Sequence, residues 1–142
     1  MNIDESFGYI INLTARNVKK KLETKIKIYD ITTSQWAVLK VLSEEDNLTQ
    51  AEVAERLAAD RATTGTVIDK LINKKLVYRN QCENDRRANR VNISDYGQEL
   101  AEKISCEAVK CNHNALNGFN EEEIEKLINY LQRVNSNLNR EE

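Results

Sequence analysis

The chain has 142 residues with no proline and only four glycines, a composition that favours long helices in one domain or in one domain with helical extensions. No apolar run is long enough to span a membrane, and the N-terminus lacks a signal-peptide pattern, so we expect a cytoplasmic protein without membrane contacts. The net charge of −2 hides an asymmetry, because residues 60–90 carry eight Lys or Arg against four Asp or Glu. Residues 94–142 carry five against ten. A basic segment in an otherwise acidic chain is the charge pattern of a nucleic-acid-binding protein.

Residues 4–29 are predicted to form one long helix, because apolar residues recur in it at spacings of three, four and seven. These residues are Phe7, Ile10, Ile11, Val18, Leu22 and Ile26. A helix of about 25 residues is roughly 37 Å long, which is more than a small core requires. We therefore expect its apolar face to pack on a second copy of the chain. Lys19, Lys20 and Lys21 lie midway along it and are interpreted as a solvated face.

Two shorter helices are predicted next, and each opens with the pattern of a capping box. Thr32 and Gln35 form the first box, directly ahead of Trp36, which we interpret as a core residue. Thr49 and Glu52 form the second box. In this pattern the first side chain accepts from the backbone amide three residues on, and the later side chain reaches back to the first amide.

A tight turn at residues 58–59 leads into a further helix, Asp60 to Leu76, which gives a helix-turn-helix. Asp60 suits the N-cap, because its carboxylate can accept the free amide protons of the first turn. Thr64, Ile68 and Leu71 share an inward face. The opposite face carries small, polar or cationic side chains, namely Ala62, Thr63, Thr66 and Lys70. Such a face can approach base edges in a DNA groove, although taken alone it is equally the solvated face of an ordinary helix.

A short hairpin is predicted after this helix. Residues 76–79 and 90–93 have the character of strands, and residues 81–89 between them form a polar tip rich in turn residues. Arg86, Arg87 and Arg90 lie at or near this tip. A helix followed by a hairpin with an arginine-rich tip indicates a winged helix-turn-helix, which is a mainly α fold with a small β-hairpin wing.

Two helices complete the chain. Ser94 is the expected cap of the first, which runs to about Leu116, with Tyr96, Leu100, Ile104 and Val109 on its buried side. Residues 117–119 break it, and Asn120 with Glu123 forms a third capping box. The last helix has Ile124, Leu127, Ile128, Leu131, Val134 and Leu138 on one face. This face is too apolar for a lone terminal helix, so we expect a two-fold dimer that covers it.

The hairpin resembles that of a known family. Residues 85–97, DRRANRVNISDYG, are similar to the wing signature of the MarR-family transcriptional regulators, which is D-x-R, an alternating strand and then T-x-x-G. With Cys82 three residues ahead of Asp85, the segment most resembles the SlyA-like branch. The upstream patterns T-x-x-Q-W-x-x-L from Thr32 and L-T-Q-x-x-V-A from Leu48 also fit. Lys75 is a departure, because relatives usually have glycine there, which adopts a left-handed C-cap at less cost.

The resemblance implies a homodimeric repressor that binds palindromic operators and is relieved by a small aromatic or phenolic ligand. Residues 31–94 would be the winged helix-turn-helix DNA-binding domain, and residues 1–30 and 95–142 the N- and C-terminal dimerisation helices. Its partners would be double-stranded DNA and a second copy of the chain. No cofactor, metal or enzymatic activity is expected, because one histidine and no glycine-rich phosphate loop leave nothing from which to build an active site.

Ten residues of the helix and the wing are expected to form the DNA site, namely Arg61, Ala62, Thr63, Thr66, Lys70, Lys74, Asp85, Arg86, Arg87 and Arg90. The cationic side chains would bind phosphates, while Thr63 and Thr66 would read bases in the major groove. Arg87 is expected to enter the adjacent minor groove. Asp85, two residues earlier, would pair with Arg87, and ordinary turn chemistry is the alternative for it.

The resemblance also places an effector where the dimer helices meet the DNA-binding lobe. The matching positions here are Thr32, Ser34, Trp36 and Arg79. An aromatic wall, two hydroxyls and a guanidinium suit a carboxylate on a ring, that is, a small aromatic acid. The alternative is a tryptophan in the core and an arginine on a DNA phosphate.

Two other functions stay open at the level of sequence. The three cysteines, Cys82, Cys106 and Cys111, are spaced neither as a disulfide framework nor as a zinc site. Reduced thiols are the plain interpretation, and a redox-controlled regulator or activator of the same fold is the alternative. A winged helix used only for protein contacts is a further alternative, but it would not need three arginines at the wing tip.

Overall fold

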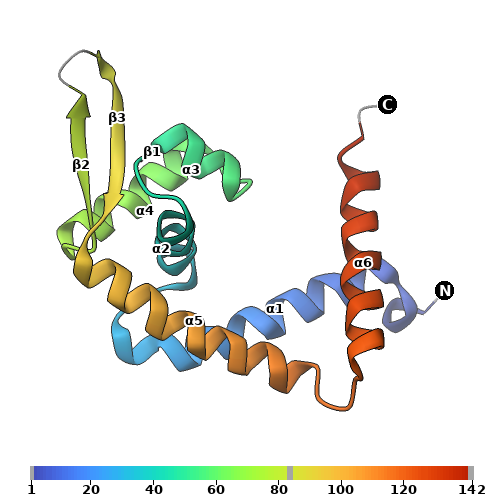
Figure 1. The fold of residues 1–142 in the computed structure, drawn as a ribbon. Coiled ribbons are helices and arrows are strands. Elements are labelled where there is room, and N and C mark those ends of the chain that lie inside the picture. Colours follow the sequence, from blue (N-terminus) through green and yellow to red (C-terminus); the bar gives the residue numbers. More distant parts are fainter. Residues whose placement is uncertain (1, 83–84, 141–142) are drawn as a thin grey trace. The chain divides into compact units, whose positions relative to one another are not determined.

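The computed structural model describes residues 2–82 and 85–140, and the side chains of all of these except residues 81–88. Its helices are α1 (Phe7–Ile26), α2 (Thr33–Glu44), α3 (Gln50–Arg56), α4 (Arg61–Asn73), α5 (Asp95–Ala115) and α6 (Glu121–Leu138), with short 3-10 turns at Ile3–Glu5 and Lys27–Tyr29. The strands are β1 (Leu48–Thr49), β2 (Val77–Cys82) and β3 (Asp85–Ile93) (Figure 1). The predicted mainly α fold with a β-hairpin wing is confirmed.

The chain divides into two compact units, Met1–Cys111 and Asn112–Glu142, which are described separately. The first unit contains the helix-turn-helix, the wing and α1. The second unit contains α6. Among the described residues, no helix combines the length and the apolar content that crossing a membrane requires.

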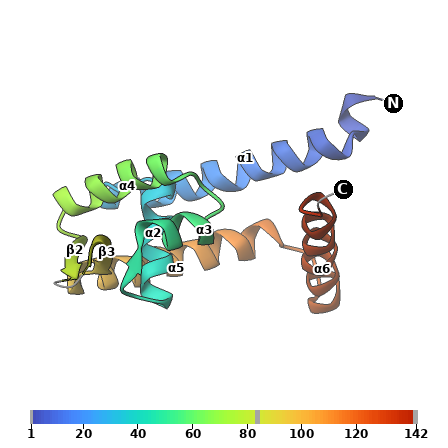
Figure 2. The ribbon, with the colours of Figure 1, turned by 90° about the horizontal axis from the view of Figure 1, so that it is seen from above.

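The core of the first unit is built around α2, which contacts α1, α3, α4 and β3 (Figure 2). Leu39 of α2 is fully buried, and so are Ile26 at the end of α1 and Ile104 of α5. Ile68 and Leu71 of α4 are fully buried as well, which confirms the inward face predicted for this helix. Because one face of α4 is fixed in the core, its opposite face is left to solvent.

The sheet has three antiparallel strands in the order β1-β3-β2. Strand β1 was not predicted; in it Leu48 pairs with Val91 and Thr49 with Arg90 of β3. The two wing strands are also longer than predicted, because residues expected to form the polar tip continue the β2–β3 ladder, with Cys82 paired to Asp85. The register shifts between Asn80 and Cys82, so the ladder continues through an irregularity into the segment whose turn-forming composition had predicted a loop.

Two of the three predicted capping boxes are complete, and in the third Thr49 Oγ1 still accepts from Glu52 N (3.1 Å). Gln35 N donates to Thr32 Oγ1 (3.1 Å) and Thr32 N to Gln35 Oε1 (3.2 Å), and the box of Asn120 with Glu123 is also present. At Thr49, however, the Glu52 carboxylate accepts from the Thr49 hydroxyl (3.0 Å) rather than from its amide. Thr49 is also the last residue of β1, so its backbone lies in the sheet.

Lys75 has a φ of 61°, the left-handed conformation expected at this helix end. Its amide donates to Ile72 O (2.9 Å), and the amide of Leu76 donates to Leu71 O (3.0 Å), as in a capped C-terminus. The departure from glycine therefore leaves the turn unchanged, and lysine carries the steric cost of this conformation.

Several apolar side chains are exposed in the single chain. Leu100 and Ile104 of α5 are buried as predicted, but Tyr96 and Val109 are 59% and 67% exposed, so their assignment to the buried side is wrong for one copy. The buried residues of α5 end at Ile104, which leaves the second half of the helix without a core to cover. In α1, Phe7 is exposed, as are Ile10, Ile11 and Val18. In α6, Ile128 and Leu138 are exposed.

Candidate nucleic-acid interface

The outer face of α4 is organised by its N-cap, Asp60. One carboxylate oxygen accepts from Thr63 N (2.7 Å) and the other from the Thr63 hydroxyl (2.8 Å). These bonds, first from the backbone of Thr63 and then from its hydroxyl, hold the pKa of the Asp60 carboxyl below its ordinary value. The cap therefore stays ionised at neutral pH, at the positive end of the helix dipole.

The predicted reading face is exposed. Arg61, Ala62, Thr63, Thr66 and Lys70 are all open to solvent. The Thr66 hydroxyl donates to Ala62 O (3.1 Å), and the Thr63 hydroxyl donates to Asp60. Both hydroxyl protons are therefore used in hydrogen bonds within the helix and its cap. What Thr63 and Thr66 offer outward is an acceptor lone pair and a methyl group. In the major groove these groups match the amino groups of adenine or cytosine and the methyl of thymine.

Two cations of the predicted DNA site are engaged elsewhere. The Lys74 ammonium donates to the Asp30 carbonyl and to Gln35 Oε1 (3.2 Å), and lies 3.6 Å from the Asp30 carboxylate. The Arg90 guanidinium donates to Asn47 O (3.0 Å) and lies 3.9 Å from the Glu52 carboxylate. The structure thus separates Lys74 and Arg90 from the exposed group on α4.

The wing contributes Asp85, Arg86 and Arg87, whose backbone lies in β3. Their side chains fall outside the described residues, and so does the predicted pairing of Asp85 with Arg87. Of the three cysteines, Cys106 is exposed and Cys111 half-buried, both as free thiols, and the side chain of Cys82 is not among those described.

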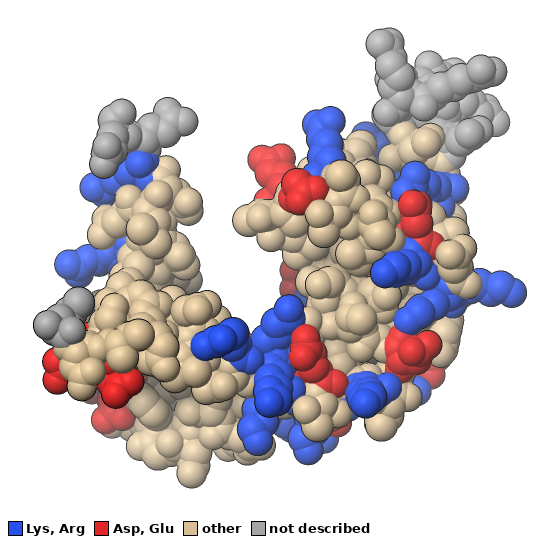
Figure 3. All heavy atoms as spheres, turned by 180° about the vertical axis from the view of Figure 1, so that it is seen from behind, with Lys and Arg blue, Asp and Glu red and all other residues tan. Residues whose placement is uncertain are grey.

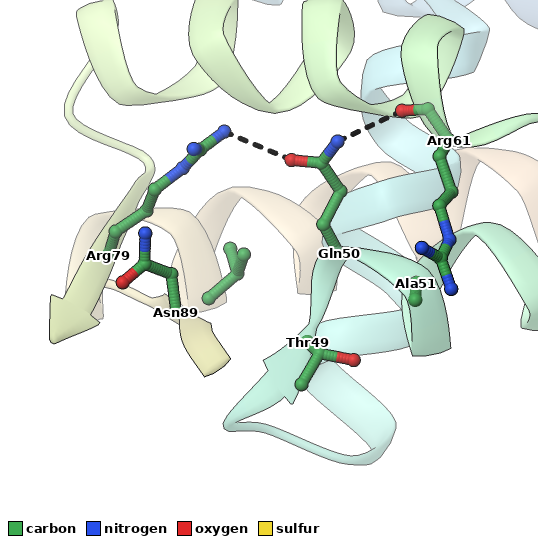
Figure 4. Close-up of a pocket in the computed structure, with 7 residues that line it drawn as sticks. Thr49, Gln50, Ala51, Arg61, Arg79 and Asn89 are labelled. Carbon is green, nitrogen blue, oxygen red and sulfur yellow. Dashed lines mark hydrogen bonds between the residues drawn. The ribbon is translucent and has the colours of Figure 1, made fainter. Parts of the chain in front are cut away.

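A polar hollow of about 260 Å³ lies where α3, α4 and the wing meet, and its lining includes Gln50, Arg61, Arg79 and Asn89 (Figure 4). Gln50 Nε2 donates to Arg61 O (3.0 Å), and Arg79 Nη2 donates to Gln50 Oε1 (3.2 Å). Arg79 also forms an ion pair with Asp69 of α4 (2.9 Å). Sequence reasoning missed Gln50, although a glycine inside the helix pattern at Gly65 was a signal that another group approaches there.

The four residues of the predicted effector site are not brought together. Ser34 and Trp36 line a shallow, mostly apolar hollow of about 510 Å³ between α1 and α2, together with Lys19 and Leu22. Thr32 caps α2, and Arg79 lines the other hollow. Trp36 packs against the core, and within the described part of the chain its buried indole Nε1 has no hydrogen-bond partner.

The charge around α4 is local rather than uniform. Figure 3 shows the side of the first unit on which α4 lies, with Lys and Arg side chains spread over it and Asp and Glu among them. Electrostatic attraction to a phosphate backbone would therefore depend on particular cations, such as Arg61 and Lys70, rather than on a broad basic surface.

A short helix, a tight turn, a second helix with an exposed polar face and a β-hairpin together define a winged helix-turn-helix, a class of DNA-binding fold. The model of the MarR family matches residues 31–88, which cover most of this unit. The resemblance stated from the sequence is confirmed: the chain has the fold of the MarR-family transcriptional regulators, and the model of that family matches its winged helix.

Solved structures of this family are similar over nearly the whole chain. The transcriptional regulator SlyA is 26% identical with a TM-score of 0.84, and the match covers 90% of each chain. The DNA complex of MepR from S. aureus is 25% identical with a TM-score of 0.84, over 95% of this chain and 98% of that one. A putative MarR-family regulator from Listeria monocytogenes, complexed with a 26mer DNA, is 25% identical with a TM-score of 0.86, over 94% and 89%.

Proposed function

We propose that the chain is a homodimeric transcriptional repressor that places α4 of each copy in the major groove of a palindromic operator. The observation that carries the proposal is the exposed face of α4, where Asp60 orders Thr63 beside Thr66 and Lys70. Two recognition helices related by a two-fold axis read two half-sites, so the operator mirrors the symmetry of the dimer. The MepR and Listeria structures with bound DNA support this use of the fold.

Within this proposal the side chains divide by task. Arg61 and Lys70 bind phosphates, Thr63 and Thr66 read base edges, and Ala62 lets the helix approach closely. Arg87 of the wing reaches the neighbouring minor groove, with Asp85 paired to it, and Arg86 binds a phosphate. Lys74 and Arg90 support DNA binding indirectly. Their hydrogen bonds to Asp30, Gln35 and Asn47 stabilise the DNA-binding lobe.

The dimer is proposed from the apolar residues that the single chain leaves exposed. Phe7, Ile10 and Val18 of α1 and Ile128 and Leu138 of α6 are each more than 40% exposed. A second copy that covers α1 and α6 would remove this surface from water, which is the main favourable term in association. This divides the chain into residues 31–94 for DNA and residues 1–30 and 95–142 for dimerisation.

We also propose that a small aromatic acid relieves repression by binding in the hollow between α1 and α2. Trp36 supplies an aromatic wall there, Ser34 a hydroxyl, and Lys19 a cation for the carboxylate. In this proposal Lys19 binds the ligand carboxylate, the role predicted from the sequence for Arg79. Such a ligand releases DNA only if it binds the DNA-incompetent spacing of the two recognition helices more tightly than the competent one.

The DNA-binding part is tested by footprinting on the promoter of the chain's own gene, followed by titrations with variants. Thr63→Val and Thr66→Val should change which operator variants are preferred, since only the hydroxyl is lost. Lys70→Ala should weaken all sequences alike and flatten the salt dependence by about one unit. Lys103→Ala on α5 is a control with the same loss of charge. Absence of any operator binding at low salt would favour a protein-interaction module instead.

The effector part is tested with salicylate. Trp36 is the only tryptophan, so a change in protein emission beyond that of free tryptophan with the same salicylate reports on the hollow. Salicylate should change this emission and release a bound operator, and Lys19→Ala should weaken both effects together. Binding that changes neither the emission nor the operator affinity contradicts the pocket and the mechanism.

A further inference from the structure

One side chain, Gln50, joins three parts of the DNA-binding lobe. It stands at the start of α3, its amide nitrogen donates to the backbone carbonyl of Arg61 in α4 (3.0 Å), and its amide oxygen accepts from Arg79 in β2 (3.2 Å) (Figure 4). A primary amide can do both at once, because it carries a donor and an acceptor. Gln50 therefore links the recognition helix to the base of the wing.

Arg79 is held from two sides. Asp69, on α4, accepts from its guanidinium at 2.9 Å, and Gln50 accepts from the same nitrogen at 3.2 Å. The planar guanidinium fixes the directions of its donors, so two acceptors on different helices define its orientation. Because Arg79 belongs to β2, these contacts orient the wing strand relative to α4.

Gly65 makes room for this arrangement. A Cβ atom at Gly65 would lie 2.5 Å from Gln50 Nε2 and 3.2 Å from its Cδ, so the Gln50 amide occupies the space that a side chain would need. Glycine is unfavourable inside a helix compared with alanine, yet here it stands within α4 and is buried. The close approach of Gln50 gives this glycine a physical reason.

We propose that Gln50 is a positioning residue that sets the wing at a fixed angle to the recognition helix before DNA is met. The effect on DNA binding rests on the proposed function, whereas the fixed angle is a property of the free protein. A pre-set angle means that the groove contacts of α4 and of the wing form together, without the entropic cost of ordering one after the other. The same contacts make Arg79 part of this brace.

The first experiment compares Gln50→Ala with Gln98→Ala, a matched control whose side-chain amide donates to Glu102 within α5. In the free protein, residual dipolar couplings of the β2 amides should shrink relative to those of α4 in Gln50→Ala and stay unchanged in Gln98→Ala. Operator affinity should fall about tenfold in Gln50→Ala, the size of one lost hydrogen bond to a charged group. A loss of fold stability alone would not change the couplings of the folded state.

The second experiment uses Gly65→Ala, alone and together with Gln50→Ala. The added methyl meets the far end of a flexible side chain, so the helix should keep its fold while Gln50 is displaced. Gly65→Ala should therefore lower operator affinity about as much as Gln50→Ala, and should have no further effect once Gln50 is alanine.

Two results would overturn the proposal: unchanged β2 couplings in Gln50→Ala, or an equal effect of Gly65→Ala with and without Gln50. These results differ from a failure of the proposed function, in which the unaltered chain would bind no operator while the coupling data still showed a fixed wing.

Discussion

Asp60 is the residue on which the chemistry of α4 depends, because it caps the helix and fixes the hydroxyl of Thr63 at the same time. Its pKa is lowered in the fold, mainly by the backbone amide of Thr63. A carboxyl with a lowered pKa stabilises the fold at pH values above its unfolded pKa, and this contribution is lost as the pH falls through the folded pKa.

Asp60→Asn tests this charge, since asparagine caps helices about as well as aspartate. We expect the variant to be less stable at neutral pH, and the difference in free energy of unfolding to shrink to nothing through the acid range. Urea denaturation at several pH values measures it. A difference that does not depend on pH would show that the charge of Asp60 is not what stabilises the cap.

Lys75 holds a left-handed conformation that suits glycine, with a φ of 61°. Lys75→Gly should raise the free energy of unfolding by about 1 kcal/mol, because the Cβ that crowds this conformation is removed. Lys103→Gly, inside α5, should lower it by about 1 kcal/mol, since there glycine only loses helix propensity. Chemical denaturation of both variants gives the signs, and destabilisation by Lys75→Gly would contradict the account of this turn.

Among the elements, the start of α5 is bonded to the turn that joins α4 to β2. The Ser94 hydroxyl contacts the carbonyls of Lys75 and Leu76 and accepts from Gly97 N (3.0 Å). A Cβ at Gly97 would collide with the backbone carbonyl of Leu76 and press on Ile93. The Leu76 backbone near Gly97 cannot move aside, whereas the Gln50 side chain near Gly65 can. A methyl group should therefore be tolerated less well at Gly97 than at Gly65.

Gly97→Ala should therefore lower the free energy of unfolding by about 1–3 kcal/mol, as for overpacking in a rigid site. Gly65→Ala is the comparison within the same lobe, with an expected loss well below that of Gly97→Ala. Thermal and urea unfolding of the two variants decide it. Equal losses would mean that the obstacle at Gly97 yields as easily as the Gln50 side chain does.

The predictability of each element depended on how local its signal was. The caps at Thr32 and Asp60 and the inward face of α4 follow from neighbouring residues and were predicted. Strand β1 was missed because two residues carry no alternation, and its partner Arg90 lies about 40 residues further on. The bridge through Gln50 and the separation of Trp36 from Arg79 depend on distances between helices, which no local pattern contains.

At the scale of the whole molecule, the apolar residues of α6 predict an obligatory partner surface. Ile128 is 45% exposed in the single chain, so Ile128→Glu should leave the fold of one copy intact but place a charge in the dimer interface. We expect sedimentation velocity to show the 16.4 kDa monomer for this variant and twice that mass for the unaltered chain. Gln132→Glu adds the same charge to α6 at an exposed polar position and should remain dimeric. A monomeric unaltered chain would end the dimer hypothesis.

The strand order, with β3 between β1 and β2, has a consequence for aggregation. It leaves β2 with an outer edge to which no described strand is bonded. Open strand edges recruit strands from other molecules, and charged residues on the edge are the usual protection. Here that edge exposes Tyr78, Arg79 and Asn80, of which only Arg79 is charged. Arg79 is thus the one charged residue on the described part of this edge, and an apolar β-branched residue in its place should favour strand addition and aggregation.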